Sequence, residues 1–296
     1  MSVSKALGDP KEAKLEQGTI RYRERGTGEP IVFVHGLLVN GDLWRKVVPE
    51  LAKDFRCITP DWPLGSHEIP MNRDADLTPT GLAKLIADFL AALELENVTL
   101  VGNDSGGALS QIVVTEHPER IARLVLTPCD AFEVFPPRLF KYLSVVPRIP
   151  GAMFQLAQSM RIRAIRRLPI AYGGLTKRPL EREISDSYVR PSISSGDIRH
   201  DTAKFLKSVS SEYTLAAAAK LGQFDRPVLL AWIRGDRFFP LDLAQRLMAE
   251  FPNARLEVID DARTFVPEDQ PGRLAQLIGS FVSEPLRHGS AEGVAS

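Results

Sequence analysis

Residues 98–111 constrain the fold of this chain more than any other stretch. The apolar run 98–101 ends at Gly102 and is followed by a helical pattern, which predicts a strand that turns tightly into a helix. A turn of this kind strains its central residue and needs small residues two positions before and after it. Gly102 and Gly106 meet that requirement around Asp104. A register centred on Ser105 is the alternative, and it puts Asn103 where a small residue is needed.

Strand and helix patterns alternate along most of the chain. Residues 18–35 are predicted as a hairpin, with alternation over 19–24, a turn at 26–28 and an apolar run over 31–34. Further strands are predicted at 55–59, 121–127, 225–232 and 254–259, and amphipathic helices at 42–55, 79–93 and 106–116. Such alternation predicts an α/β fold in which helices cover both faces of a mostly parallel sheet.

One segment interrupts this alternation. Residues 132–216 contain short helical patterns among several prolines and few strand signals, which predicts an inserted helical cap. The sequence therefore divides into a first core part (1–131), the cap (132–216), a second core part (217–283) and a tail (284–296). The tail is rich in Gly, Ser and Ala and is predicted to be disordered.

Composition excludes several classes of protein. Lys plus Arg and Asp plus Glu both number 37, so the net charge of zero gives no electrostatic case for nucleic acid. No apolar run is long enough for a signal peptide or a membrane span, and Cys57 and Cys129 are predicted as buried thiols, which together favour a cytoplasmic protein. Arg161, Arg163, Arg166 and Arg167 indicate a solvated helix face, with an anionic substrate or a membrane surface as alternatives. Oligomeric state stays open.

The motifs together resemble the α/β-hydrolase superfamily, in the aspartate-nucleophile branch of haloalkane dehalogenases and epoxide hydrolases. The turn around Asp104 resembles the nucleophile elbow, and His35-Gly36 resembles the pair that follows the third strand. The resemblance implies that Asp104 attacks carbon and that the N–H groups of Leu37 and Ser105 form the oxyanion hole. It also implies that Asp236, after a later strand, is the acid of the triad, with Asp130 as a weaker substitute. No cofactor or metal is implied.

The resemblance fails at the residue that should be histidine. By the family's register Thr264 occupies the position of the catalytic histidine, and threonine cannot activate water near neutral pH. His67 or His200 could serve as a displaced base. Dehalogenases commonly carry tryptophan where this chain has Ser105, and asparagine where it has Leu37, so support for dehalogenation is weak.

Three functions remain open at this stage. The first is hydrolysis of a small apolar ester, epoxide or alkyl halide, with Asp104 as nucleophile and an atypical triad of Asp104, Asp236 and Thr264. The second is a non-hydrolytic protein that binds a small apolar ligand. The third is a lyase or isomerase in which Asp104 is a general acid or base. Residues predicted to lie near the substrate are His35, Asn40, Phe135 and Tyr188.

Overall fold

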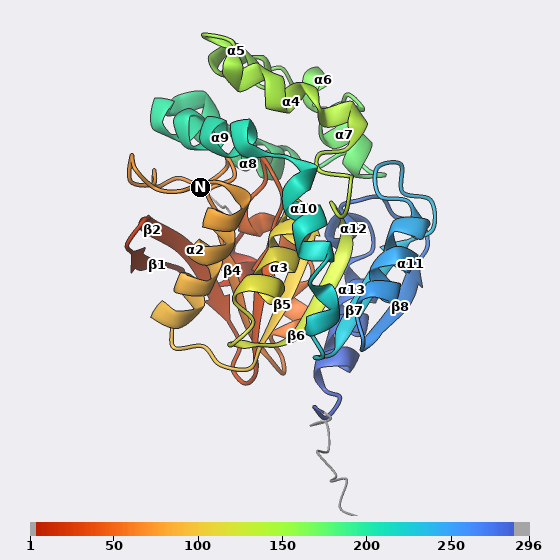
Figure 1. Ribbon diagram of the computed structural model, residues 1–296. Helices are drawn as coiled ribbons and strands as arrows, with labels where there is room; N and C mark the ends of the chain where they lie inside the picture. Colours follow the sequence, from red (N-terminus) through yellow and green to blue (C-terminus); the bar gives the residue numbers. More distant parts are fainter. Residues whose placement is uncertain (1–3, 287–296) are drawn as a thin grey trace, which may run out of the picture.

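The computed structural model describes residues 4–286 and contains an eight-stranded sheet in the order β1-β2-β4-β3-β5-β6-β7-β8. All neighbours from β4 to β8 are parallel, whereas β2 is antiparallel to both β1 and β4. This arrangement confirms the predicted fold class (Figure 1). The strands are β1 (Pro10–Leu15), β2 (Gly18–Arg25), β3 (Pro30–Val34), β4 (Arg56–Pro60), β5 (Val98–Asp104), β6 (Ile121–Cys129), β7 (Val228–Ile233) and β8 (Ala254–Ile259).

The predicted hairpin over 18–35 is wrong. Its two strands, β2 and β3, do not pair, because β4 lies between them, with Arg23 opposite Thr59 on one side and Val32 opposite Ile58 on the other. The hairpin partner of β2 is instead β1, a strand that the sequence analysis did not predict. The central strands β3, β5, β6 and β7 are buried along almost their entire length, as parallel strands covered on both faces must be.

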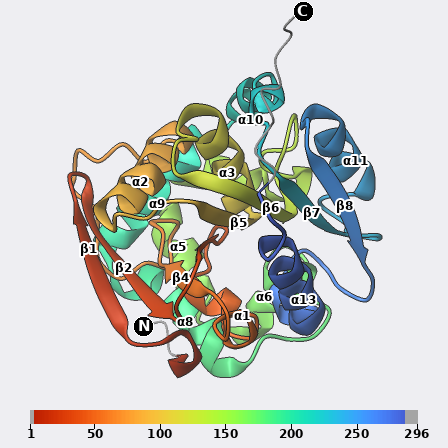
Figure 2. The ribbon, with the colours of Figure 1, turned by 90° about the horizontal axis from the view of Figure 1, so that it is seen from below.

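Helices cover the sheet in two layers (Figure 2). One layer contains α2 (Pro79–Ala92), α3 (Ser105–Glu116), α10 (Ser211–Ala218) and α11 (Leu241–Glu250). The other contains α1 (Val48–Leu51), α12 (Val266–Asp269) and α13 (Pro271–Val282). The predicted helix over 42–55 is shorter than expected: a 3₁₀ turn, η2 (Gly41–Trp44), precedes α1, which has Pro49 in its first turn. Two further 3₁₀ turns are η1 (Lys5–Leu7) and η5 (Leu221–Gln223).

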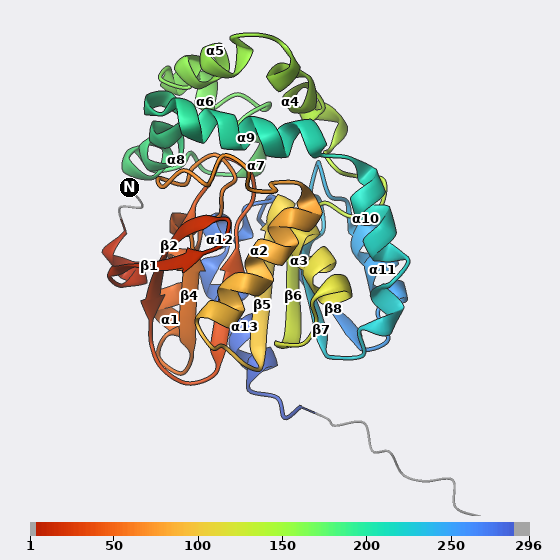
Figure 3. The same cartoon turned by 60° about the vertical axis from the view of Figure 1, so that its left-hand side comes forward.

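The cap segment lies above the carboxyl ends of the strands (Figures 1 and 3). It consists of η3 (Arg138–Phe140), α4 (Tyr142–Val145), η4 (Val146–Arg148), α5 (Ala152–Ser159), α6 (Arg163–Arg166), α7 (Tyr172–Leu175), α8 (Arg182–Ser194) and α9 (Gly196–Ser208). The boundary predicted at residue 216 falls inside α10, which packs beside α3 of the core. Of the predicted tail, residues 287–296 lie outside the described residues. Within residues 4–286, no helix combines the length and apolar character needed to cross a membrane.

Candidate functional site

Asp104 is the central residue of the turn between β5 and α3. Its backbone has φ 55° and ψ −132°, a conformation that L residues rarely adopt, whereas Ser105 is already the first residue of α3. The turn also requires glycine at Gly106, because a Cβ there would lie 2.2 Å from the carbonyl oxygen of Val34. The strained position is therefore Asp104, and the geometry favours this register over one centred on Ser105.

The Asp104 carboxyl group is buried and hydrogen-bonded by backbone N–H groups. Burial raises its pKa to about 7, opposed by the N–H groups of Ser105 and Leu37 that donate to it, and the negative charge of Asp236 adds to the rise. Gly36 makes this close approach possible, because a Cβ there would lie 2.1 Å from Asp104 Oδ2. The two N–H groups predicted as the oxyanion hole thus converge on the side chain of Asp104.

A second buried carboxyl group, that of Asp130, lies beside Asp104. Asp130 follows the end of β6, and the neighbouring Cys129 is opposite Asp104 in the parallel register. Burial and the Asp104 carboxyl group raise the pKa of Asp130 well above its usual value, although the Ser105 hydroxyl donates a hydrogen bond to it. Asp130 Oδ1 is buried with no hydrogen-bond partner among the described residues. Burial and the neighbouring Asp104 charge thus favour the protonated form of Asp130.

Asp236 and Thr264 follow the ends of β7 and β8 and are hydrogen-bonded to each other. The Thr264 hydroxyl donates a 2.8 Å hydrogen bond to Asp236 Oδ2, and Oδ1 accepts the N–H groups of Phe238 and Phe239. Burial raises the pKa of Asp236, and these three donors oppose the rise. Asn103, next to Asp104 in the turn, connects this pair to the elbow. Its side-chain amide donates a hydrogen bond of 2.8 Å to the carbonyl oxygen of Thr264. The Thr264 hydroxyl is therefore the side-chain partner of Asp236.

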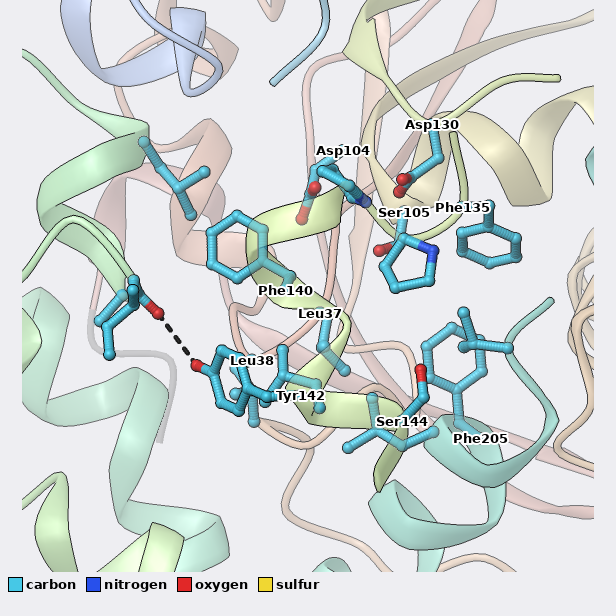
Figure 4. A pocket seen from close by; sticks show the side chains of 18 of the residues that line it. Leu37, Leu38, Asp104, Ser105, Asp130, Phe135, Phe140, Tyr142, Ser144 and Phe205 are labelled. Atoms are coloured by element: carbon cyan, nitrogen blue, oxygen red, sulfur yellow. Dashed lines mark hydrogen bonds between the residues drawn. The ribbon is translucent and has the colours of Figure 1, made fainter. Parts of the chain in front are cut away.

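An apolar cavity with about 820 Å³ of empty space, including its open mouth, lies between the elbow and the cap. Figure 4 shows Asp104, Ser105 and Asp130 together at one end, with Phe140, Leu37 and Phe205 among the side chains that face them. Its other walls come mainly from the cap: Phe135, Pro136, Pro137, Tyr142, Leu143, Leu156, Met160, Ile170, Tyr172, Leu175, Leu206 and Val209. The cavity is suited to a small apolar molecule.

Two cap tyrosines line the cavity, but both donate their hydroxyl protons to backbone carbonyl groups. Tyr142 donates to Ile170 at 3.0 Å, a bond drawn in Figure 4, and Tyr172 donates to Leu38 at 2.6 Å. In this arrangement neither hydroxyl group is directed as a proton donor into the cavity.

Of the four residues predicted near the substrate, only Phe135 lines this cavity. His35 is buried behind it, where Nε2 accepts the N–H of Trp62 at 2.9 Å, and burial lowers its pKa to about 4. Asn40 instead caps η2 through the N–H of Asp42. Tyr188 packs on Tyr172 from α8 and is fully buried. Local hydrogen bonds and packing on the opposite side thus direct these three side chains away from the cavity.

The displaced histidines do not reach the cavity either. His67 contacts Asp201 and accepts the N–H of Gly65, and His200 contacts Asp201 from the half-exposed side. None of the histidines in residues 4–286 lines the cavity.

The sequence analysis considered Asp130 only as a substitute acid and missed its contact with the elbow. The sequence did contain an indication of this contact, because Asp130 comes just after a central strand. The carboxyl ends of neighbouring parallel strands meet at one edge of a sheet, so residues that follow them lie close together.

The strained elbow, the converging N–H groups and the roofed apolar cavity define an α/β hydrolase. A family model described as "alpha/beta hydrolase fold" matches residues 29–271, and the chain belongs to that family. It is 29% identical over 276 residues to "Haloalkane dehalogenase 2" of Mycobacterium tuberculosis (strain ATCC 25618 / H37Rv), covering 88% of this chain and 91% of that protein.

Other relatives act on different substrates. The chain is 27% identical over 284 residues to "Cis-3-alkyl-4-alkyloxetan-2-one decarboxylase" of Shewanella oneidensis, covering 90% of this chain and 85% of that protein. Among solved structures, "Epoxide hydrolase CorEH without ligand" superposes with a TM-score of 0.77 at 21% identity, over 92% of this chain and 98% of that one. At that identity the likeness concerns the fold.

Proposed function

We propose that this protein is a hydrolase in which the Asp104 carboxylate attacks an electrophilic carbon of a small apolar substrate. The observation that carries the proposal is the elbow: a strained Asp104 whose carboxyl group accepts the N–H groups of Leu37 and Ser105 at the end of an apolar cavity. The two N–H donors hold the carboxylate in place for attack, and the same donors would stabilise the oxyanion that forms later.

Within the predicted substrate classes, an epoxide or a strained cyclic ester fits better than an alkyl halide. A departing halide needs N–H donors, yet the lining drawn from residues 4–286 includes no tryptophan, and the indoles of Trp62 and Trp232 donate to carbonyl groups elsewhere. A departing alkoxide needs a proton instead, and Asp130 lies beside Asp104 to supply one. One of the relatives, at 27% identity, is named for a strained oxygen ring, an oxetan-2-one.

Asp130 would act as the acid in the first step. For an epoxide, the Asp104 carboxylate forms a bond to the ring carbon and the ring C–O bond breaks. The departing alkoxide takes the proton of Asp130. The products are an ester on Asp104, a hydroxyl group on the substrate and an ionised Asp130.

The same residue would act as the base in the second step. Ionised Asp130 takes a proton from water while the hydroxide adds to the ester carbon of Asp104, and the oxyanion is stabilised by the N–H groups of Leu37 and Ser105. Collapse of this intermediate breaks the C–O bond to the substrate, and the departing alkoxide takes the carboxyl proton of Asp104. The diol is released, Asp104 is again a carboxylate, and Asp130 keeps the proton that it took from water. Asp130 thus takes over the proton transfers that a histidine performs elsewhere in the family, since Thr264 cannot.

A single turnover of styrene oxide in H₂¹⁸O, with enzyme in excess, tests the nucleophile. We expect an unlabelled diol and ¹⁸O in the peptide that contains Asp104, because the first product takes its oxygen from the carboxylate. Asp104→Asn abolishes both signals. Label in the diol, or an adduct on Ser105, contradicts Asp104 as nucleophile.

Asp130→Asn tests the acid. We expect alkylation of Asp104 by styrene oxide to slow by about 10²-fold or more, because general acid catalysis contributes that much. Alkylation by 1-bromohexane, which needs no proton, should keep its rate. The matched control is Asp61→Asn, which changes another buried carboxyl group with a raised pKa, outside the cavity. Equal slowing with both reagents would indicate a structural role for Asp130.

Proton transfer without a covalent intermediate is a second candidate. The pKa of Asp104, raised to about 7, and the raised pKa of the neighbouring Asp130 favour it as the alternative. Its signature in the same experiments is a rearranged or eliminated product with no ¹⁸O in the Asp104 peptide. Ligand binding without either product would indicate a non-hydrolytic binding protein.

A further inference from the structure

The cap segment is strongly basic in a chain whose charges otherwise balance. Residues 134–180 contain no aspartate or glutamate, although the whole chain has as many acidic as basic residues. The same stretch contains nine basic residues: Arg138, Lys141, Arg148, Arg161, Arg163, Arg166, Arg167, Lys177 and Arg178. An imbalance of this size within one segment predicts attraction to an anionic partner.

Most of this positive charge is not neutralised. Arg163 and Arg166 pair with Asp186, and Lys177 pairs with Asp261. For the others the described part of the chain provides no ion pair, and most of them are exposed. The cap therefore presents a net positive surface.

Exposed apolar side chains concentrate in the same segment. Across residues 4–286 the large apolar side chains that remain exposed are mainly those of Leu139, Val145, Ile149, Phe154, Ile162, Leu168 and Ile170, and the two outside the cap are Leu215 and Met248. Ile149 is 54% exposed and Ile162 is 57% exposed. A surface that gathers apolar side chains between cations is typical of protein segments that lie in a membrane interface.

These residues belong to the outermost layer of the molecule. The helices α4, α5 and α6 lie at the end of the cap that is farthest from the sheet (Figures 1 and 3). The same segment also forms much of the cavity wall, since Phe140, Leu156, Met160 and Ile170 line it. The segment that carries the exposed apolar side chains is therefore also a wall of the cavity.

We propose that the outer surface of the cap, residues 138–170, docks on an anionic lipid bilayer. The apolar side chains enter the boundary between headgroups and acyl chains, while the arginines contact the lipid phosphates. The positive charge of the cap favours an anionic partner. The exposed apolar side chains favour a bilayer over nucleic acid, because a bilayer has an apolar interior that they can enter and a nucleic-acid backbone does not. This proposal does not depend on the chemistry assigned to Asp104.

Sedimentation of the full chain with vesicles tests the proposal. Vesicles of phosphatidylcholine alone are compared with vesicles that also contain phosphatidylglycerol, at low and at high salt. We expect the anionic vesicles to bind the protein at least about tenfold more tightly, because cations near the surface are attracted to anionic headgroups, and we expect added salt to weaken the binding by screening that attraction. Equal partitioning to both vesicles, or binding to duplex DNA without binding to vesicles, overturns the proposal.

Two double variants identify the surface. Ile149→Ser with Ile162→Ser removes apolar contacts, and Arg161→Gln with Arg167→Gln removes charges; neither pair lines the cavity. Each should weaken vesicle binding about tenfold or more, while the melting temperature of the protein in solution stays unchanged. The matched controls, Leu215→Ser with Met248→Ser and Arg234→Gln with Arg273→Gln, lie outside the cap and should bind like wild type. Equal losses in the variants and their controls overturn the assignment.

Discussion

The buried carboxyl group of Asp104 makes the free energy of unfolding depend on pH. Its pKa is raised to about 7 from 3.8, so between these values the folded chain holds a proton that the unfolded chain has lost. Stability therefore falls as the pH rises through this window. Relative to Asp104→Asn, we expect wild type to lose at most about 4 kcal/mol, since each pKa unit corresponds to 1.36 kcal/mol. Denaturant titrations at several pH values in this window measure the free energy of unfolding of both proteins. The same pH dependence in wild type and Asp104→Asn would contradict the prediction.

Substitution of Thr264 by histidine tests whether a base beside Asp236 would speed hydrolysis of the Asp104 ester. Thr264→His should place an imidazole against Asp236, which now accepts the threonine hydroxyl at 2.8 Å. In the Asp130→Asn background we expect this variant to hydrolyse the Asp104 ester about 10²-fold faster or more, as a restored general base would.

The measurement is the decay of the ester by intact-protein mass spectrometry. Because Thr264 is fully buried, the larger side chain should also lower stability by about 1–3 kcal/mol. Thr264→Val, which removes the hydroxyl group without adding a base, is the control. A folded Thr264→His variant with no faster decay would show that Asp236 cannot orient a base from this position.

At the residue scale, the sequence predicts the place of a residue in the structure where that residue belongs to a local motif. The glycines on either side of Asp104 identify the turn, and Asp236 and Thr264, both chosen as candidates from the sequence, are hydrogen-bonded to each other in the structure. The predictions for His35 and Tyr188 differ from the structure because the direction of a buried side chain depends on tertiary partners. His35 is held by the N–H of Trp62, distant in sequence.

At the scale of elements, the contact between α3 and β3 depends on glycine. A Cβ on Gly106 would lie 2.2 Å from Val34 O and 2.5 Å from His35 O, so Gly106→Ala must push α3 away from β3. We expect a loss of more than about 2 kcal/mol, at the upper end of the cost of overpacking, and loss of Asp104 alkylation.

Gly272→Ala is a matched control, because Gly272 also lies in the first turn of a helix but its Cβ would meet nothing within 4 Å. There alanine should be neutral or stabilise by up to about 1 kcal/mol. Thermal and denaturant unfolding compare the two variants. Similar effects in both would mean that the close contact at Gly106 does not position α3.

Elements are predictable where their signals are local. The strand predicted over 254–259 matches β8, and the helix predicted over 79–93 matches α2, which is capped by the Thr78 hydroxyl through the N–H of Gly81. The hairpin over 18–35 is wrong because β2 pairs with β4, and that pairing depends on a strand about thirty residues later rather than on the turn at 26–28. A local turn pattern does not determine which strand lies next in a sheet.

At the scale of the whole molecule, the cap is attached to the core through a buried aspartate of α9. Asp201 Oδ2 accepts the N–H of Met71 at 2.9 Å and contacts His67 Nε2 at 3.3 Å, both in the loop that leads to α2. Burial alone would raise the pKa of Asp201, but these bonds outweigh it and lower the pKa. The stability from this contact is therefore present above the unfolded pKa of about 3.9 and is lost as the pH falls below it.

Asp201→Ala should consequently cost about 1–3 kcal/mol at neutral pH, because it leaves a buried N–H group without its acceptor. Asp197→Ala on the same helix removes only an exposed pair with Arg73 and should cost less than about 1 kcal/mol. Denaturant unfolding gives both values, and amide hydrogen exchange should increase across α8 and α9 in the first variant alone. In acid, the difference between wild type and Asp201→Ala should shrink. If both variants lose the same stability, or if only core amides exchange faster, the attachment of the cap does not depend on Asp201.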